Sequence, residues 1–169
     1  MNIYTLRPAT PFDGDQIWAV LQQAIARRKA DGSNQWQDGY PNPAVVANDI
    51  EKGVGYVATH HDKIVGYVAV LVNDEPEYAR LDGQWLTNAD FIVFHRVAVA
   101  EDYLGIGVAK ALFDFIEAYA KQQGIVSIKA DTNFDNPAML SLFEKYGYVY
   151  CGEVYFRGSP RKAFEKVVG

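Results

Sequence analysis

The sequence contains a single cysteine, Cys151, among 169 residues. One cysteine excludes an internal disulfide and a zinc site built from cysteines. The sequence also has no apolar run near the roughly 18 residues that a membrane span requires. Basic residues are the minority, because 16 lysines and arginines stand against 21 aspartates and glutamates, for a net charge of −5. Nucleic acid is therefore not the expected partner, since phosphate backbones are bound by basic surfaces.

The first eight residues lack the basic-then-apolar layout of a signal peptide, so we expect a cytoplasmic protein without a membrane segment. The length suits one domain over residues 1–169, because a second core would leave each half thin. Aromatic residues, in contrast, are abundant: 9 Phe, 11 Tyr and 3 Trp make up 14% of the chain. Such rings can fill a core or line a pocket.

The periodicity of apolar residues predicts a mixed order of strands and helices. In the first half we expect a strand at 3–7, a helix capped by Thr10, a short helix at 43–52, and strands at 54–59 and 64–72. In the second half we expect a strand at 91–99, a helix from Gly107 to Gly124, a strand at 125–130, a helix at 136–146, and strands at 147–156 and 162–168. This order is typical of an α+β layer fold around a central sheet.

The polar residues between these elements have simple structural interpretations. Arg27, Arg28 and Lys29 lie near a helix C-terminus and are expected to complement its dipole. His60 and His61 are expected to be solvated turn residues that point to opposite faces, so that they share no metal. The long connection 73–90 is either functional or a family-specific insertion.

Gly105 and Gly107 stand between a predicted strand and a predicted helix. At such a junction, free backbone N–H groups and the positive end of the helix dipole meet, which suits a phosphate group. A tight turn without a ligand is the alternative. Two known phosphate motifs are absent: a dinucleotide fingerprint needs glycine where Lys110 stands, and the sequence has no Gly-Lys-Ser/Thr.

Three segments carry a family resemblance. They read Arg-Val-Ala-Val at 96–99, Asp-Tyr-Leu-Gly-Ile-Gly at 102–107 and Asn-Pro-Ala-Met-Leu-Ser-Leu-Phe-Glu-Lys-Tyr-Gly-Tyr at 136–148. Over residues 91–156 the sequence resembles the GNAT (GCN5-related) superfamily of acyl-CoA-dependent N-acetyltransferases. The resemblance implies an α/β (α+β) fold with a central mixed, mostly antiparallel sheet flanked by helices. It also implies transfer of an acetyl group from acetyl-CoA to a primary amine on a small molecule or peptide.

The resemblance further implies which residues hold coenzyme A. The pantetheine arm would meet Val97, Ala98 and Val99, and Asn136 and Phe143 would reach it from the facing helix. The pyrophosphate would lie on the turn formed by Leu104, Gly105, Ile106, Gly107, Val108 and Ala109. No metal is expected.

This sequence departs from the family pattern at three places. Asp102 replaces the usual Gln or Arg, and we expect it to turn away and stabilise the helix start. Ala138 and Met139 depart from the usual alanine spacing, and Phe143 replaces the tyrosine that often serves as general acid.

The chemistry needs a base more than an acid. Deprotonating an alkyl amine at pH 7 costs about 4.6 kcal/mol, whereas releasing a thiolate costs only about 2 kcal/mol. His95 is the candidate base for direct attack through a tetrahedral intermediate, with a structural histidine in the sheet as the alternative. It stands two residues before Val97 and is expected on the same strand face. Tyr146 or water would protonate the thiolate, and an N–H at a bend near Val97 would bind the oxyanion.

Four rings on irregular segments are candidate walls of the amine site: Trp36, Tyr40, Tyr78 and Trp85. They favour a bulky or aromatic amine, unless they merely pack under the loops. Arg157, Ser159 and Arg161 are expected to face water, with binding of an acidic substrate group as the alternative. The superfamily resemblance is compatible with a homodimer. The competing function is a catalytically weak acyl-CoA-binding sensor domain, which the missing hydroxyl at Phe143 and the absence of a strand glutamate near Val93 motivate.

Overall fold

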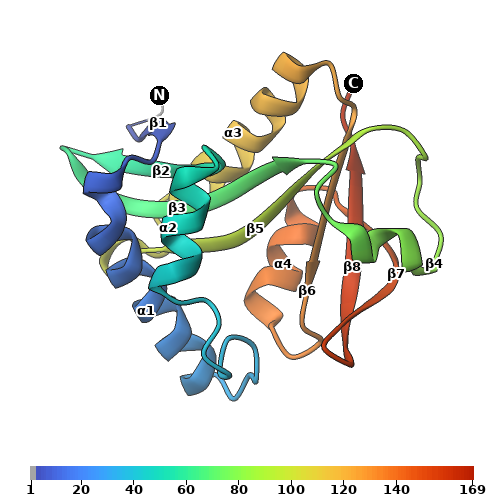
Figure 1. The fold of residues 1–169 in the computed structure, drawn as a ribbon, viewed down its shortest axis with the longest axis horizontal. Helices are drawn as coiled ribbons and strands as arrows, with labels where there is room; N and C mark the ends of the chain where they lie inside the picture. Colours follow the sequence, from blue (N-terminus) through green and yellow to red (C-terminus); the bar gives the residue numbers. More distant parts are fainter. Residues whose placement is uncertain (1–2) are drawn as a thin grey trace. The chain divides into compact units, whose positions relative to one another are not determined.

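The helices and strands follow the predicted mixed order in the computed structural model, which describes residues 3–169. The first half holds β1 (Thr5–Pro8), the 3-10 helix η1 (Pro11–Asp13), α1 (Gly14–Ala30), α2 (Pro43–Glu51), β2 (Gly55–His60) and β3 (Lys63–Val72). The middle holds η2 (Pro76–Arg80), β4 (Asp82–Gly83), β5 (Phe91–Val99), η3 (Glu101–Tyr103) and α3 (Val108–Gln123). The last part holds β6 (Ser127–Thr132), α4 (Pro137–Lys145), β7 (Val149–Phe156) and β8 (Ser159–Val167) (Figure 1).

The strands form a mixed, mostly antiparallel sheet, as the sequence predicts. Their order is β1-β2-β3-β5-β6-β8-β7-β4. Phe91–Val93 of β5 pairs in parallel with Ser127–Lys129 of β6, whereas β1 with β2, β2 with β3, β6 with β8 and β7 with β8 pair antiparallel. Within residues 3–169, four α-helices flank the sheet. The predicted fold class is therefore confirmed.

The described residues divide into two compact units. Unit 1 comprises the chain up to Val70 together with His95–Ile116, and unit 2 comprises Leu71–Phe94 together with Glu117–Gly169. β3, β5 and α3 each contribute residues to both units. Each unit is described by itself below.

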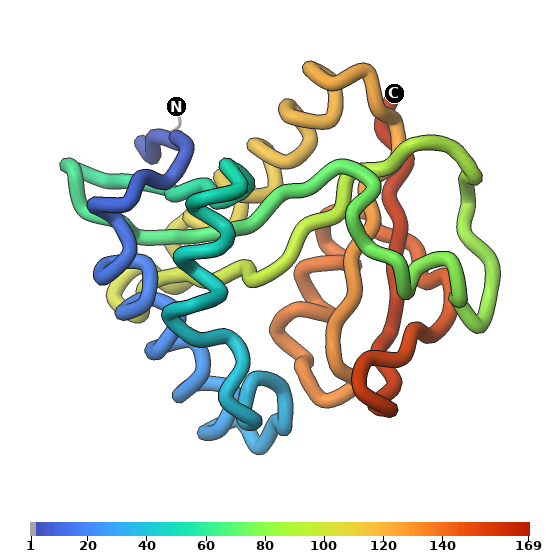
Figure 2. Tube along the Cα trace, in the orientation of Figure 1, coloured from blue at the N-terminus to red at the C-terminus, as the bar shows by residue number. Residues whose placement is uncertain are grey.

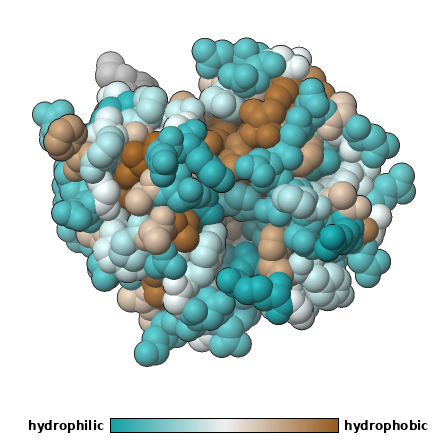
Figure 3. All heavy atoms as spheres, viewed as in Figure 1, coloured by the Kyte–Doolittle hydropathy of each residue, from teal (hydrophilic) through white to brown (hydrophobic). Residues whose placement is uncertain are grey.

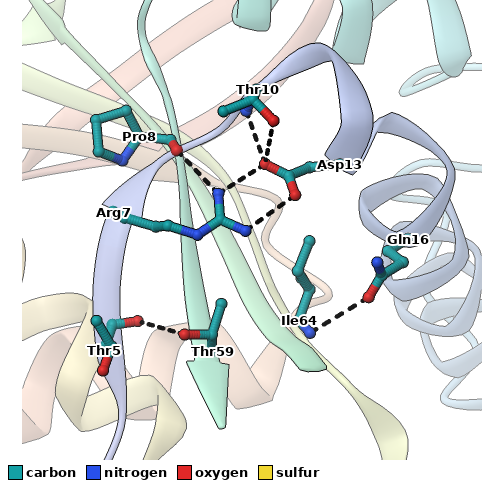
Figure 4. Close-up of polar contacts among 8 residues, drawn as sticks. All are labelled: Thr5, Arg7, Pro8, Thr10, Asp13, Gln16, Thr59 and Ile64. Carbon is teal, nitrogen blue, oxygen red and sulfur yellow. Dashed lines mark hydrogen bonds and ion pairs between the residues drawn. The ribbon is translucent and has the colours of Figure 1, made fainter. Parts of the chain in front are cut away.

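In unit 1, α1 and α2 lie next to each other (Figure 1). The apolar stripe of α1 is buried as its period predicts: Ile17, Leu21 and Ala24 are completely inaccessible to solvent. Figure 4 shows how α1 begins. The amide of Thr10 donates to the Asp13 carboxylate at 2.7 Å, and the Arg7 guanidinium donates to both of its oxygens at 2.7 and 2.9 Å. The hydrogen bonds from Arg7, above all, lower the pKa of Asp13 to about 2.

In unit 2, aromatic rings form much of the core. Phe143 from α4 packs on Phe94, Tyr148 and Phe164, with ring centroids 4.6 to 6.3 Å apart. The tube in Figure 2 follows the green connection after β3 out to β4, which pairs with β7. That connection, 73–90, is more ordered than a loop, because it contains η2 and β4.

Two predictions about polar residues are wrong. The rings of His60 and His61 lie with centroids 4.1 Å apart, because His61 adopts a left-handed backbone with φ of 49° and so breaks the alternation of a strand. Arg28 is buried against the Trp36 ring, and Arg27 donates to the Val99 carbonyl oxygen at 2.8 Å, so neither merely complements the helix dipole. Burial lowers the pKa of both arginines.

The surface in Figure 3 is largely hydrophilic, with apolar side chains in smaller areas between the polar ones. Across residues 3–169, no helix combines the length and apolarity needed to cross a bilayer. Within the same described residues, no cluster of three or more His, Cys, Asp or Glu side chains is arranged to hold a metal ion.

Candidate active site

The last part of β5 carries the candidate acyl-transfer residues, and its backbone is bent. Arg96 has a φ of 59°, in the left-handed region that a non-glycine residue rarely adopts inside a strand. The bend expected near Val97 therefore lies at Arg96. A shared face for His95 and Val97 is predicted from the alternation of side chains along a regular strand. The bend at Arg96 lies between the two residues and interrupts that alternation. His95 is partly exposed, whereas Val97, Ala98 and Val99 are buried.

The Arg96 side chain lies in a buried polar network. Its Nε and Nη2 donate to the two oxygens of Asp49 at 2.9 and 2.6 Å, and its Nη1 donates to the Tyr40 hydroxyl at 2.6 Å. The Tyr67 hydroxyl also donates to Asp49, at 2.6 Å. Burial, together with the neighbouring Asp49 carboxylate, raises the pKa of Tyr67. The network joins β5, α2, β3 and the segment before α2.

The glycine turn follows β5 and leads directly into α3. Gly105 and Gly107 have φ values of 75° and 95°, which only glycine adopts without strain. The Tyr4 hydroxyl donates to the Ile106 carbonyl oxygen at 2.7 Å and so ties the turn to the segment before β1. Asp102 lies in η3 and is exposed, six residues before α3 begins. It therefore lies in the first turn of η3 and not at the start of α3, where it was expected.

This turn is built to accept an anion. A helix of 16 residues begins at Val108, and the N–H groups of its first turn have no partner within the helix. A Cβ atom placed on Gly105 would meet no protein atom within 4 Å, so the outer side of the turn is open. The positive end of the helix dipole adds to the attraction for negative charge. The residues present thus fit a diphosphate.

The aromatic candidates differ in how they are held. Trp36 is only 8% exposed and packs under its own loop, beside the Arg28 guanidinium. Tyr40 is half-buried and bound to Arg96. In unit 2, Tyr78 is 2% exposed and donates its hydroxyl to Asp131 at 2.6 Å. The pKa of Tyr78 is raised well above its ordinary value by burial and by that carboxylate.

Trp85 and Tyr78 are brought together, with ring centroids 5.1 Å apart, and the Trp85 indole N–H donates to the Tyr78 carbonyl oxygen at 2.9 Å. The ammonium of Lys129 lies 4.3 Å from the Trp85 ring centroid and 4.4 Å from that of Phe91. Burial lowers the pKa of Lys129. Arg161 donates to Asp131 at 3.3 Å and is largely buried, so the expectation that it faces water is wrong.

The candidates on α4 have structural partners. Asn136 caps the helix, because its side chain accepts from the Met139 amide at 3.2 Å and donates to Thr132 at 3.3 Å. Phe143 is 1% exposed and belongs to the aromatic core of unit 2. Tyr146 stands at the C-terminal end of α4, with the Lys145 ammonium over its ring. The coenzyme and proton-transfer roles of these three residues stay predictions.

Sequence reasoning gave no role to Asp49, to Glu165 or to the side chain of Arg96, although Arg96 lies in the motif at 96–99. Asp49 and Arg96 lie 47 positions apart, and Glu165 lies 38 positions from Ser127, whose hydroxyl it binds. Nothing in the local sequence marks these contacts, because they depend on which strands and helices come together. β8 contains four charged residues, so Glu165 does not stand out in the sequence of that strand.

Comparison with known proteins decides the family. The model of the acetyltransferase (GNAT) family matches residues 21–148. The chain belongs to the GNAT acetyltransferase family. It shares 32% identity with a GNAT acetyltransferase from Streptococcus agalactiae, covering 98% of this chain and 96% of that one, with a TM-score of 0.88.

Other similar proteins are more distant in sequence. The human protein N-acetyltransferase 8B is 28% identical over 101 residues, which span 60% of this chain and 40% of the human protein. The Salmonella typhimurium protein yncA, solved with its cofactor acetyl-CoA, shares the fold with a TM-score of 0.70 at 15% identity, covering 99% of this chain and 95% of that one. GNAT acetyltransferases use acetyl-CoA and act on amine acceptors, and acetyl transfer is thus the general activity of this family.

Proposed function

We propose that this GNAT protein binds acetyl-CoA itself and moves the acetyl group to a primary amine of a small molecule or peptide. The glycine turn carries the proposal: two glycines at positive φ, open space beside Gly105, and a 16-residue helix that starts directly after the turn. The amides of the turn from Leu104 to Ala109 would hold the diphosphate. Val97, Ala98 and Val99 would pair with the pantetheine arm. Asn136 caps α4 and Phe143 lies in the aromatic core of unit 2, so each would contact the pantetheine arm from that position.

The reaction would proceed by direct attack of the neutral amine on the thioester carbonyl. The N–C bond forms and the C–S bond breaks, while the amine loses a proton and the coenzyme thiolate gains one. His95 on β5 would accept the proton from the amine. A backbone N–H at the Arg96 bend would donate to the oxyanion, because the positive φ of Arg96 departs from the extended backbone of a regular strand. Water or Tyr146 would protonate the thiolate, since Phe143 has no hydroxyl.

The acceptor is a bulky or aromatic amine in this proposal. Tyr40 and Trp85 are the candidate rings with accessible surface, whereas Trp36 and Tyr78 are buried and serve packing. A cytoplasmic location is proposed from the acidic composition and the free thiol of Cys151. A homodimer is proposed from the family resemblance alone.

Coenzyme binding is tested first, by calorimetry with coenzyme A on the wild type and on the Gly107→Glu variant. A side chain and a negative charge at the turn should abolish binding. The matched control is Gly124→Glu, which places the same side chain at another positive-φ glycine with open surroundings, at the opposite end of α3. Unchanged binding by Gly107→Glu would refute the assignment of the turn.

Turnover is tested by thiol release from acetyl-CoA with a panel of polyamines, arylalkylamines, amino acids and peptides. Release with one class of amine supports the transferase and names its acceptor class. Coenzyme binding without release from any amine would instead support the sensor domain, which the buried, hydroxyl-free Phe143 favours. A wild type that binds no coenzyme would overturn both.

A further inference from the structure

The left-handed backbone of Arg96 costs free energy, because a non-glycine residue at positive φ crowds its own side chain against the backbone. Such a conformation persists only where the surrounding structure determines it more strongly than the local preference. The strand itself does not supply that determination, since a regular ladder favours φ near −120°. The explanation must therefore lie in what the Arg96 side chain binds.

Asp49 on α2 supplies the required hold. Its two oxygens accept from Nε and Nη2 of Arg96 in the forked geometry that arginine and carboxylate share, at 2.9 and 2.6 Å. The side chains are 10% and 3% exposed, so water does not replace the bond. Breaking such a pair would leave a buried charge without its partner.

Tyr67 in turn fixes Asp49. Its hydroxyl donates to the carboxylate at 2.6 Å, and the ring has no exposed surface. The chain makes room for this ring with Gly55, where a Cβ would lie 2.8 Å from the Tyr67 hydroxyl oxygen. The Asp49 carboxylate is thus fixed by its own helix, α2, and by Tyr67 of β3, and it can in turn fix Arg96 of β5.

Arg96 also holds the candidate acceptor segment. Its remaining terminal nitrogen, Nη1, donates to the Tyr40 hydroxyl at 2.6 Å. One guanidinium therefore joins the bend of β5 to the segment that carries Tyr40. A change at Asp49 should alter both together.

We propose that Asp49 is a positioning residue for acyl transfer, acting through Arg96 to hold the β5 bend and Tyr40 in their working geometry. This inference rests on the proposed function, in which an N–H at that bend stabilises the oxyanion. Asp49, which lies on α2 and outside the motifs at 96–99, 102–107 and 136–148, would thus influence the rate of the transfer step. Most of the coenzyme affinity is expected from the diphosphate on the glycine turn, which the Tyr4 hydroxyl holds through the Ile106 carbonyl oxygen and not through Asp49.

The Arg7–Asp13 pair offers a matched control. It is also an arginine–carboxylate pair with two hydrogen bonds, here from Nη1 and Nη2 of Arg7 at 2.7 and 2.9 Å; its Asp side chain is 8% exposed, and it lies in the same unit at the start of α1 (Figure 4). Asp13→Asn and Asp49→Asn therefore remove the same kind of interaction. Only Asp49→Asn touches the bend.

The experiment compares Asp49→Asn, Asp13→Asn and wild type at a temperature well below the melting point of each. We expect Asp49→Asn to lower kcat by about 10- to 100-fold, in the range of a weakened oxyanion donor, with the Kd for coenzyme A within threefold of wild type. Hydrogen exchange of the backbone over residues 95–99 should speed up in Asp49→Asn. Asp13→Asn should keep kcat within twofold and leave that exchange unchanged.

Exchange and activity separate this inference from the proposed function. Unchanged exchange at 95–99 in Asp49→Asn would overturn the positioning role whatever the activity. A kcat equal to that of Asp13→Asn would overturn it as well. A wild type without turnover defeats the proposed function, while the exchange result still decides whether Asp49 holds the bend. If Asp49→Asn does not fold, Arg96→Lys, which keeps the charge but loses the fork, should show the same exchange and kcat changes.

Discussion

Replacing Glu165 by glutamine should loosen the connection 73–90 from the sheet of unit 2. Glu165 on β8 has no exposed surface. Its carboxylate accepts from the Leu86 amide at 2.7 Å, from the Thr87 hydroxyl at 2.5 Å and from the Ser127 hydroxyl at 2.6 Å. One side chain of β8 thus binds both β6 and the segment next to Trp85.

The size of the effect follows from these three short bonds. A hydrogen bond to a charged group contributes about 1.5–3 kcal/mol, against about 1 kcal/mol for a neutral pair. Glutamine keeps the shape of Glu165 but loses the charge and turns one acceptor oxygen into a donor. The loss of about 1 kcal/mol per bond is partly offset, because a neutral amide is easier to bury than a carboxylate. The net destabilisation should be about 2 kcal/mol.

Urea denaturation measures this change in the free energy of unfolding. We expect Glu165→Gln to lower it by about 2 kcal/mol with an unchanged m-value. The control is Glu153→Gln on β7, where the carboxylate accepts an exposed bond from Tyr155, and the change should stay below about 0.5 kcal/mol. The KM for the amine should also rise in Glu165→Gln, because Trp85 adjoins the released segment. If Glu165→Gln is as stable as Glu153→Gln, the role of Glu165 in binding the connection 73–90 to the sheet is refuted.

Two further predictions concern single side chains. His95→Ala should lose more than about tenfold in turnover at every pH, with coenzyme affinity kept, while His61→Ala in the exposed turn should stay near wild type; a smaller loss would remove His95 as the base. Asp13, whose pKa is lowered to about 2 mainly by the Arg7 hydrogen bonds, stabilises the fold above its unfolded pKa of about 4. Stability worth about 1 kcal/mol, reduced by the partial exposure of Arg7, should vanish as pH falls from about 4 to about 2. The free energy of unfolding of Asp13→Asn, followed as the pH is lowered, should not show this loss. If wild type and Asp13→Asn have the same pH profile, the prediction is contradicted.

Local patterns made much of the fold predictable. The strand Phe91–Val99 and the helix ended by Gly124 lie where apolar periodicity and glycine placed them, because each signal occupies consecutive residues. The glycine turn was readable for the same reason. The Arg96 bend could be placed only to within a residue, since arginine has no preference for positive φ and the cause, Asp49, lies on α2.

Contacts between distant residues could not be predicted from the sequence, because they depend on how the strands align with one another. The pairing of Lys129 with Glu165 follows from the alignment of β6 with β8, which no local motif determines. The same holds for Arg161, whose partner Asp131 ends β6. Sequence reasoning placed it in water because an arginine beyond a strand is usually solvated.

The aromatic excess bears on the acceptor in a different way once the rings are located. Tyr67, Phe113 and Phe143 are fully buried, and Tyr78 and Trp36 nearly so, which means that core packing accounts for many of the rings. The acceptor proposal therefore depends on Tyr40 and Trp85 and not on composition. The Tyr40 hydroxyl accepts from Arg96, and the Trp85 indole N–H donates to a backbone oxygen. Rings fixed in this way present one face at little entropic cost, and that favours a flat or bulky amine over a thin, flexible one.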